Sequence, residues 1–173
     1  MKTVLYSAAM NRRQAIALMA VSAPALAQPI TQNRFVGCWK LRSCVRTLRD
    51  GQTQYPFGRN PVGRLVYEKS GRMYALLMHP ERRTTVPADR DLDQAPDEEL
   101  RKLVSGFLAY YGTFHVDHAN RTVTHHVEAS LVPSWVGANL KRNYQFEGDS
   151  LVLTRVLPDG TTPDRLIWDR EPD

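Results

Sequence analysis

Apolar and polar residues alternate with a period of two along most of the chain after residue 34, with turn residues between the alternating runs. A period of two places neighbouring side chains on opposite faces of a β-strand, whereas a helix repeats every 3.6 residues. The turn residues recur at roughly the 8 to 12 residue spacing that is typical of antiparallel sheets. The pattern therefore predicts an all-β domain.

We expect strands at residues 34–47, at both ends of 63–78, and at 113–117, 121–131, 140–148, 150–156 and 164–170. Trp39, Leu41 and Val45 share one face of the first strand. Residues 63–78 form the clearest predicted hairpin, because Gly71 can adopt the positive φ of a tight turn. Closing about eight to nine strands into an antiparallel β-barrel removes the exposed edges that an open sheet would leave.

Residues 95–112, APDEELRKLVSGFLAYYG, are the one segment with helical spacing. Pro96 suits a first helical turn, the three acidic residues after it favour a helix N-terminus, and Gly112 can end the helix. Apolar residues recur at positions 100, 103, 104, 107 and 108. We expect this helix to pack on the barrel, with its apolar stripe in the core.

The first 27 residues have the features of an export signal rather than of a folded domain. Arg12 and Arg13 precede an apolar run that ends in small residues, which suits cleavage after residue 27. The arginine pair resembles a twin-arginine signal, although general secretion is also compatible with the segment. Translation could start at Met1 or at Met10.

A single domain at residues 28–173 remains after cleavage, and its charge is nearly balanced. Removal of the signal takes away Lys2, Arg12 and Arg13, which leaves 20 of the 23 Lys and Arg residues against 18 Asp and Glu. Because no basic run is interleaved with aromatic residues, we expect no nucleic-acid partner. The signal's apolar run is shorter than the roughly 20 residues that span a bilayer. We therefore expect a periplasmic or secreted protein without a membrane span.

Cys38 and Cys44 are the only cysteines in the chain. On one extended strand they would share a face but stand about 20 Å apart at about 3.3 Å per residue, which is too far for a disulfide. We expect two unpaired thiols. His115 and His125 supply two imidazoles without a third convergent ligand, so no metal site is expected.

Motifs of common enzymes are missing from the sequence. There is no Ser-His-Asp order, G-x-S-x-G elbow, P-loop or dinucleotide fingerprint. Their absence argues against common hydrolases and nucleotide-dependent enzymes, and we expect no cofactor. A cyclase or isomerase is not excluded, because it needs only one acid, one base and a shaped cavity.

Several separated motifs run from about residue 34 to residue 170. The first strand contains G-x-W as Gly37 and Trp39, and NPVGRLVY, AYYGTF, VTHHVEASLVPSWVG, NYQFEGDSLVLT and LIWDR follow. Together they resemble the bacterial and fungal lipocalin-like domain family. The resemblance implies a barrel closed at one end around a cavity for an apolar or amphipathic molecule. It also implies a structural contact between Trp39 and Arg170, in which the cation contributes about 0.5 to 2 kcal/mol.

The doubled histidines in VTHHVEASLVPSW point to opposite faces of a strand, so at most one of them faces the cavity. A three-residue hairpin loop at 118–120 would place His126 on the same face as Phe114. His126 and Glu128 would then form an internal polar pair that could orient a ligand or move a proton. If His125 faces inward instead, its neighbours on that face are valines, and this alternative stays open.

Arg142 shares a strand face with three apolar residues, Leu140, Tyr144 and Phe146. A charged side chain in such a row either points into a cavity, where it could hold a carboxylate or enolate, or lies at the rim in water. Arg142 is our leading candidate for ligand contact. The further candidates for the cavity lining are Tyr144, Tyr67, Phe114, Met73 and, as a cap over the cavity mouth, Trp135.

Three functions are compatible with these features. The first, which we favour, is binding of a small hydrophobic or amphipathic molecule that burial holds and that Arg142 and His126 orient. The second is a cyclase or isomerase with His126 or Glu128 as acid or base. The third is a barrel filled by its own side chains. The sequence indicates neither the identity of the ligand nor the oligomeric state.

Overall fold

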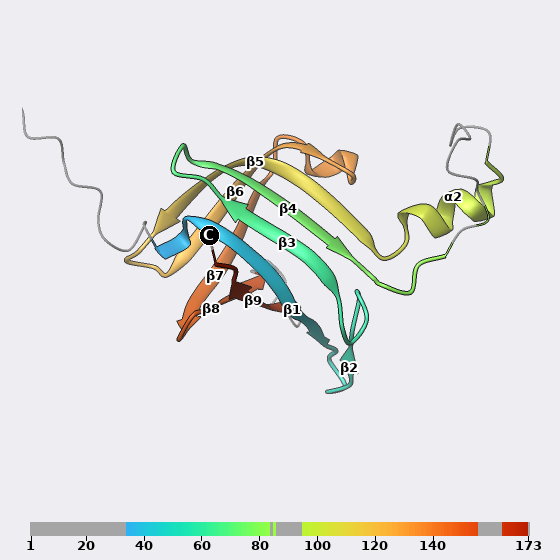
Figure 1. The fold of residues 1–173 in the computed structure, drawn as a ribbon, viewed down its shortest axis with the longest axis horizontal. Helices are drawn as coiled ribbons and strands as arrows, with labels where there is room; N and C mark the ends of the chain where they lie inside the picture. The colour runs from blue at the N-terminus through green and yellow to red at the C-terminus, as the bar shows by residue number, and fades with distance from the viewer. Residues whose placement is uncertain (1–33, 84, 86–94, 156–163, 173) are drawn as a thin grey trace, which may run out of the picture.

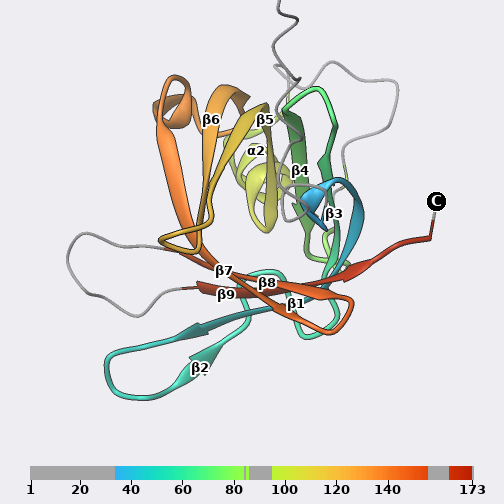
Figure 2. The same ribbon diagram turned by 90° about the vertical axis from the view of Figure 1, so that its left-hand side faces the viewer.

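The structure, a computed structural model, describes residues 34–83, 85, 95–155 and 164–172. Nine strands form one antiparallel sheet in the order β2-β1-β3-β4-β5-β6-β7-β8-β9, and β1 also pairs with β9 (Figure 1, Figure 2). This last pairing closes eight strands into a barrel and leaves β2 as an extra strand beside β1. The predicted antiparallel β-barrel is confirmed.

The strands are β1 (Gly37–Thr47), β2 (Thr53–Gln54), β3 (Val62–Tyr67), β4 (Arg72–Met78), β5 (Phe107–Asp117), β6 (Thr122–Ser130), β7 (Asn139–Glu147), β8 (Ser150–Arg155) and β9 (Asp164–Arg170). Helix α2 (Asp97–Val104) precedes β5, and the 3-10 helix η2 (Pro133–Trp135) connects β6 to β7. Within the described ranges, no helix is long and apolar enough to cross a membrane.

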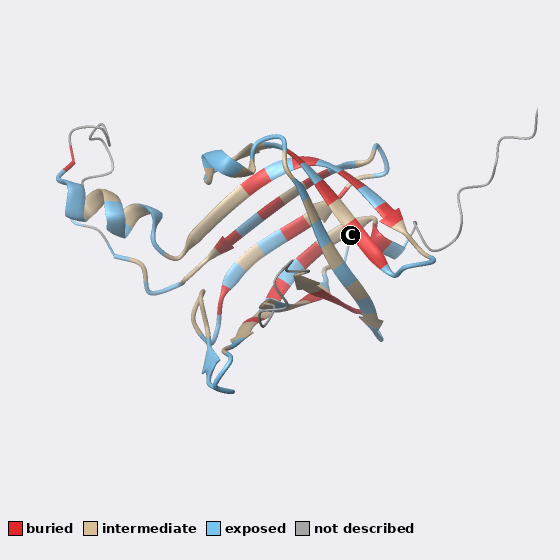
Figure 3. Cartoon of the chain, turned by 180° about the vertical axis from the view of Figure 1, so that it is seen from behind, coloured by how far each residue is buried: buried red, intermediate tan, exposed pale blue. Residues whose placement is uncertain are grey.

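Burial follows the period-two alternation in strands such as β4, β5 and β7, whereas the first four residues of β8 are all buried (Figure 3). In β4, Met73, Ala75 and Leu77 are at most 3% exposed, and the residues between them are more accessible. β3 and β4 form the predicted hairpin, and Gly71 in its turn has a φ of 88°. The inward-facing rows of the strands together make the core.

The helix predicted for residues 95–112 is wrong in its C-terminal half. α2 ends at Val104, and the chain continues from Phe107 as β5, in which Tyr110 and Phe114 face inward. Aromatic and β-branched residues favour this strand, and Gly106, with a φ of 65°, turns the chain before it. No residue of α2 is buried, and the helix extends away from the barrel (Figure 1). Its apolar stripe therefore lies outside the core, contrary to the prediction.

A β-bulge in β1 changes which side chains face inward. The pairing of β1 with β9 shifts register after Leu41, so that Trp39, Leu41 and then Cys44 are buried. Val45, predicted on that face, is only partly buried. Cys38 and Cys44 are free thiols. Cys38 Sγ donates a partly buried hydrogen bond to Glu171 Oε2, whereas Cys44 lines the cavity inside the barrel. The prediction that both cysteines share a face is wrong because the bulge exchanges the faces.

An aromatic cluster fills part of the barrel interior. The guanidinium carbon of Arg170 lies 4.3 Å from the centroid of a Trp39 ring, which confirms the predicted contact between them. Trp39 Nε1 donates a hydrogen bond to the carbonyl oxygen of Phe35 at 2.8 Å. The ring of Phe35 packs edge-to-face against Tyr67, Tyr144 and Phe146, with centroids 5.5, 4.8 and 5.2 Å away.

Gly112 allows β5 and β6 to approach closely where their register shifts. A Cβ atom on Gly112 would lie 1.9 Å from the carbonyl oxygen of His126, a backbone atom that cannot rotate away. We expect Gly112→Ala to lower the free energy of unfolding by about 3 kcal/mol, because the two strands would have to separate. Urea denaturation measures this loss, with Thr113→Ala on the outer face as the control. Equal, small effects of both substitutions would contradict the close approach.

Candidate functional site

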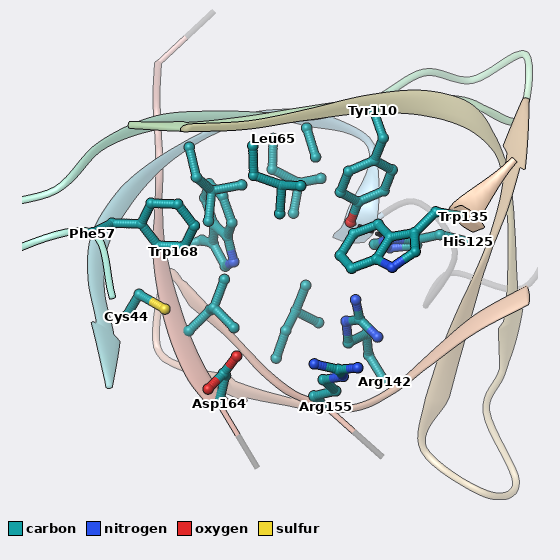
Figure 4. Close-up of a pocket in the computed structure, with 15 residues that line it drawn as sticks. Cys44, Phe57, Leu65, Tyr110, His125, Trp135, Arg142, Arg155, Asp164 and Trp168 are labelled. Atoms are coloured by element: carbon teal, nitrogen blue, oxygen red, sulfur yellow. Dashed lines mark hydrogen bonds between the residues drawn. The ribbon is translucent and has the colours of Figure 1, made fainter. Parts of the chain in front are cut away.

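A cavity opens inside the barrel next to the aromatic cluster (Figure 4). The space among its lining side chains measures about 560 Å³, and this volume includes open solvent at the mouth of the cavity. Its apolar lining consists of Phe57, Leu65, Ala75, Leu77, Leu108, Trp135, Leu153, Leu166 and Trp168. Its polar or ionisable lining consists of Cys44, Tyr110, His125, Arg142, Arg155 and Asp164. A mainly apolar wall with a few polar groups is typical of sites that bind small organic molecules.

Two arginines face this cavity from neighbouring strands. Arg142 on β7 and Arg155 on β8 are directly paired in the sheet, and both line the cavity (Figure 4). Like charges directly opposite each other destabilise a sheet. Neither guanidinium forms an ion pair with a carboxylate of the described residues. A bound anion would compensate both charges.

A buried histidine in the cavity wall, His125, lies between two tyrosines, of which Tyr110 lines the cavity and Tyr67 packs in the core. Tyr67 Oη is 2.7 Å from His125 Nε2, and Tyr110 Oη is 2.9 Å from His125 Nδ1. All three side chains belong to residues that are at most 8% exposed. Burial, and to a smaller extent the positive charges of Arg142 and His126, hold the pKa of His125 well below its ordinary value. The imidazole is therefore neutral.

The hydrogen bonds among Tyr67, His125 and Tyr110, here called the triad, show which atoms carry the protons. Neutral imidazole has one N–H donor and one acceptor nitrogen. His125 is the hydrogen-bond partner that the described residues offer to the Tyr67 hydroxyl, which is buried. If Tyr67 accepted from Nε2, its own proton would be left without an acceptor, at a cost of about 1 to 3 kcal/mol. We therefore assign Tyr67 as donor to Nε2 and Nδ1–H as donor to Tyr110. The hydroxyl proton of Tyr110 is then free to donate a hydrogen bond to a molecule in the cavity.

The other ionisable groups of the lining are less available to a ligand. Arg46 Nε and Nη2 bind the two carboxylate oxygens of Asp164 at 2.6 and 2.9 Å, which neutralises that carboxylate. Burial raises the pKa of Cys44 to about 12, so its thiol stays protonated and is a poor nucleophile. Arg142, Arg155 and Tyr110 are consequently the groups best placed to bind an anion or another acceptor.

The strand register predicted for the doubled histidines is wrong. The β5–β6 loop contains four residues rather than three, because Asp117 pairs with Thr122 instead of Arg121. Arg121 takes the left-handed conformation in this loop, with a φ of 50°. A shift of one residue exchanges the two faces of a strand. His125 therefore faces the interior, opposite the assignment that places His126 there.

His126 and Glu128 are exposed on the outer face of the barrel, so the predicted internal polar pair is wrong. His126 Nδ1 lies 2.6 Å from Oδ1 of Asn139 on the neighbouring strand. Glu128 is the extra residue of the bulge opposite Tyr111. His115, predicted on the face of His125, is also exposed. Within the described ranges, no three His, Cys, Asp or Glu residues converge on a common point.

The other predicted site residues divide between cavity and core. Trp135, in η2, lines the cavity, and its ring is nearly perpendicular to that of Tyr110 with centroids 5.8 Å apart. Arg142 shares the inner face of β7 with Leu140, Tyr144 and Phe146, as predicted. The residues that pack in the core instead are Tyr67, Phe114, Met73 and Tyr144. The binding roles of all these residues stay predictions.

Several lining residues were not predicted as site residues, and Arg155, Tyr110 and Trp168 are the polar ones that matter for the site. Arg155 follows Leu151 and Leu153 at a spacing of two, so the alternation that indicates Arg142 could also have indicated Arg155. Tyr110 lay inside the segment predicted as helix. Trp168 lies in the predicted strand at residues 164–170, and nothing in the sequence marks its indole nitrogen.

Comparisons with known proteins agree with this architecture. The lipocalin-like domain family matches residues 36–171 of the chain. A protein of Aspergillus oryzae named 4'-hydroxy-3'-methoxypropiophenone carrier protein ppsC is 38% identical over 68 residues, which are 36% of this chain and 61% of that protein. The match thus spans about three fifths of the length of the fungal relative. On the strength of the family match, which extends from β1 to the end of β9, this chain belongs to the family of lipocalin-like domains.

Proposed function

We propose that this protein binds a small, mostly apolar molecule with an anionic end inside its barrel. The observation that carries the proposal is the pair of Arg142 and Arg155, which face an otherwise largely apolar cavity without a carboxylate partner among the described residues. Burial of the apolar part would supply about 25 cal/mol per Å². The two guanidinium groups would fix the charged end through charge-assisted hydrogen bonds.

The fungal relative supports a carrier role. Its name gives its cargo as 4'-hydroxy-3'-methoxypropiophenone, a small aromatic ketone with a phenol group. A molecule of this kind combines an apolar ring with an ionisable hydroxyl, which is the combination that the cavity wall would accept. We propose a small aromatic anion as the ligand class of this chain.

We favour a carrier over a cyclase or isomerase because of where the acid–base candidates lie. His126 and Glu128 are on the outer face, away from the cavity. His125 does face the cavity, but each of its ring nitrogens is already within hydrogen-bond distance of a tyrosine hydroxyl. General acid or base catalysis needs a nitrogen that can reach the substrate.

Titration of the purified protein with 4'-hydroxy-3'-methoxypropiophenone and with 4-acetylbenzoate tests the proposal. Trp135 and Trp168 line the cavity, so saturable quenching of tryptophan fluorescence is the expected signal. Chromatography of the bound fraction should return each compound unchanged. Failure of both probes to bind would contradict the proposed function, and conversion of either probe would favour an enzyme.

We also propose that the protein acts outside the cytoplasm after removal of residues 1–27, a segment outside the described residues. Arg12 and Arg13 before an apolar run support the proposal. Expression of the full chain in a bacterium should yield an exported form that mass spectrometry shows to start at Gln28. Replacing both arginines by lysine should block export through the twin-arginine route. An uncleaved cytoplasmic chain would contradict the proposal.

A further inference from the structure

We propose that the ligand carries a second hydrogen-bond acceptor, a carbonyl or ether oxygen, which the indole N–H of Trp168 binds. The inference rests on the proposed function and narrows its ligand class. The ligand would be an anion whose charge lies at one end, next to Arg142 and Arg155, and whose neutral acceptor lies at the other end.

The indole nitrogen of Trp168 is a buried donor that has no partner within the described ranges. Trp168 is 2% exposed, and among the described residues its Nε1 is the one buried side-chain nitrogen or oxygen that forms no hydrogen bond. A buried tryptophan N–H normally has an acceptor, because leaving it unpaired is unfavourable. The unpaired N–H therefore indicates a position where something outside the chain supplies the acceptor.

The orientation of the ring makes the cavity the place where that acceptor would bind. Trp168 lies on β9 and lines the cavity, and its nitrogen points into the enclosed space (Figure 4). Arg142 and Trp135 lie on the opposite side of the same space (Figure 4). One ligand could thus be held at both ends, with its apolar middle against Leu65 and Leu153.

Trp39 provides an internal comparison for Trp168. Both indoles are almost completely buried in one core, at 1% and 2% exposure. Trp39 donates its N–H to the carbonyl oxygen of Phe35 at 2.8 Å, whereas Trp168 meets no acceptor in the part of the chain that the structure describes. Among the described residues, the indole of Trp39 in the aromatic cluster thus has a hydrogen-bond acceptor. The indole of Trp168, which borders the cavity, has none. This difference is expected if a bound ligand supplies the acceptor for the N–H of Trp168.

The two-ended site predicts a preference among anions of equal size. A simple fatty acid offers a carboxylate but no second acceptor, so it would leave Trp168 unsatisfied. An aromatic or other rigid anion with a ketone, ester or ether oxygen opposite its charge would satisfy both ends. We therefore expect the site to select keto- or alkoxy-substituted aromatic acids and phenolates over plain fatty acids.

Two matched probes test this preference. 4-Acetylbenzoate and 4-isopropylbenzoate have the same charge and nearly the same shape, and they differ in that a methyl group replaces the ketone oxygen. We expect calorimetry to show 4-acetylbenzoate binding about 5- to 30-fold more tightly, the effect of one buried hydrogen bond. In Trp168→Phe, which lacks the N–H, the two affinities should agree within about twofold, and 4-isopropylbenzoate should bind nearly as in the unsubstituted protein.

Indole nitrogen NMR gives a second readout that does not depend on the folding of the variant. The Trp168 N–H signal, one of three tryptophan signals, should move downfield with 4-acetylbenzoate and not with 4-isopropylbenzoate. Trp39→Phe and Trp135→Phe assign it by elimination if Trp168→Phe does not fold. Equal affinities of the unsubstituted protein for both probes, with no downfield shift, would overturn the role of Trp168 and leave the proposed function standing. Failure of both probes to bind would overturn the proposed function itself.

Discussion

Replacing His125 by phenylalanine is expected to lower the free energy of unfolding by about 3 kcal/mol at pH 7.5. The imidazole bonds two buried hydroxyl groups, at 2.7 Å from Tyr67 and 2.9 Å from Tyr110. A phenyl ring bonds neither hydroxyl, and a buried hydroxyl without a partner costs about 1 to 3 kcal/mol. Chemical denaturation measures the loss, and its midpoint reports it if the slope is unchanged.

The same substitution should change how stability depends on pH. Burial holds the pKa of His125 well below its ordinary value of 6.5, so between that value and the folded pKa the unfolded chain binds a proton that the folded chain does not. This contribution to stability is complete above about pH 6.5 and falls by about 1.4 kcal/mol for each pH unit below it. The difference between the unsubstituted protein and His125→Phe should therefore shrink as the pH falls from 6.5 to 5.

Two controls separate the triad from a general effect of losing a histidine. His126→Phe removes the neighbouring, exposed imidazole and should change stability by less than about 0.5 kcal/mol. The double variant Tyr67→Phe with His125→Phe should lose less stability than the sum of the single losses, because it leaves no orphaned Tyr67 hydroxyl. Additive losses, or a difference that does not vary with pH, would contradict the neutral, hydrogen-bonded His125.

Replacing Arg142 by methionine is expected to weaken binding of 4-acetylbenzoate by about 10- to 150-fold. The substitution keeps an unbranched side chain and removes one of the two cations that face the cavity, and a hydrogen bond to a charged group contributes about 1.5 to 3 kcal/mol. Stability should stay equal or rise slightly, because Arg142 lies directly opposite Arg155 and the repulsion between them is relieved. Calorimetric titration and denaturation of the same sample measure both effects.

Lys141→Met is the matched control for Arg142→Met. Lys141 is the next residue on β7 and points outward, so its removal changes the net charge equally without touching the cavity. We expect the affinity of Lys141→Met for 4-acetylbenzoate to stay within about twofold of that of the unsubstituted protein. Equal losses in both variants would mean that long-range charge, and not a contact in the cavity, attracts the anion.

The fold was predictable because side chains along a barrel strand alternate between the inner and the outer face, and the sequence shows this alternation directly. Alternation along β7 placed Arg142 with Leu140, Tyr144 and Phe146 on the inner face, and the structure agrees. The same rule failed where an extra residue enters a strand or loop. The bulge after Leu41 and the four-residue loop before Thr122 each exchange faces, and neither leaves a clear signal in the sequence.

The site was less predictable than the fold because it depends on pairings between distant strands. The triad of Tyr67, His125 and Tyr110 joins β3, β6 and β5, and a single-residue shift in register would separate it. The helical spacing of residues 95–104 extends by chance into β5, which hid Tyr110. The unpaired nitrogen of Trp168 is a property of packing alone, so only the three-dimensional arrangement reveals it.

A crystal structure of the protein with 4-bromobenzoate is the most direct measurement of whether the barrel holds a small anion. The anomalous signal of bromine locates the probe independently of its carboxylate. We predict one site inside the cavity, with the carboxylate within hydrogen-bond distance of Arg142 and Arg155 and the bromine among the apolar side chains. A probe bound on the outer surface, or a cavity without it at saturating concentration, would contradict ligand binding inside the barrel.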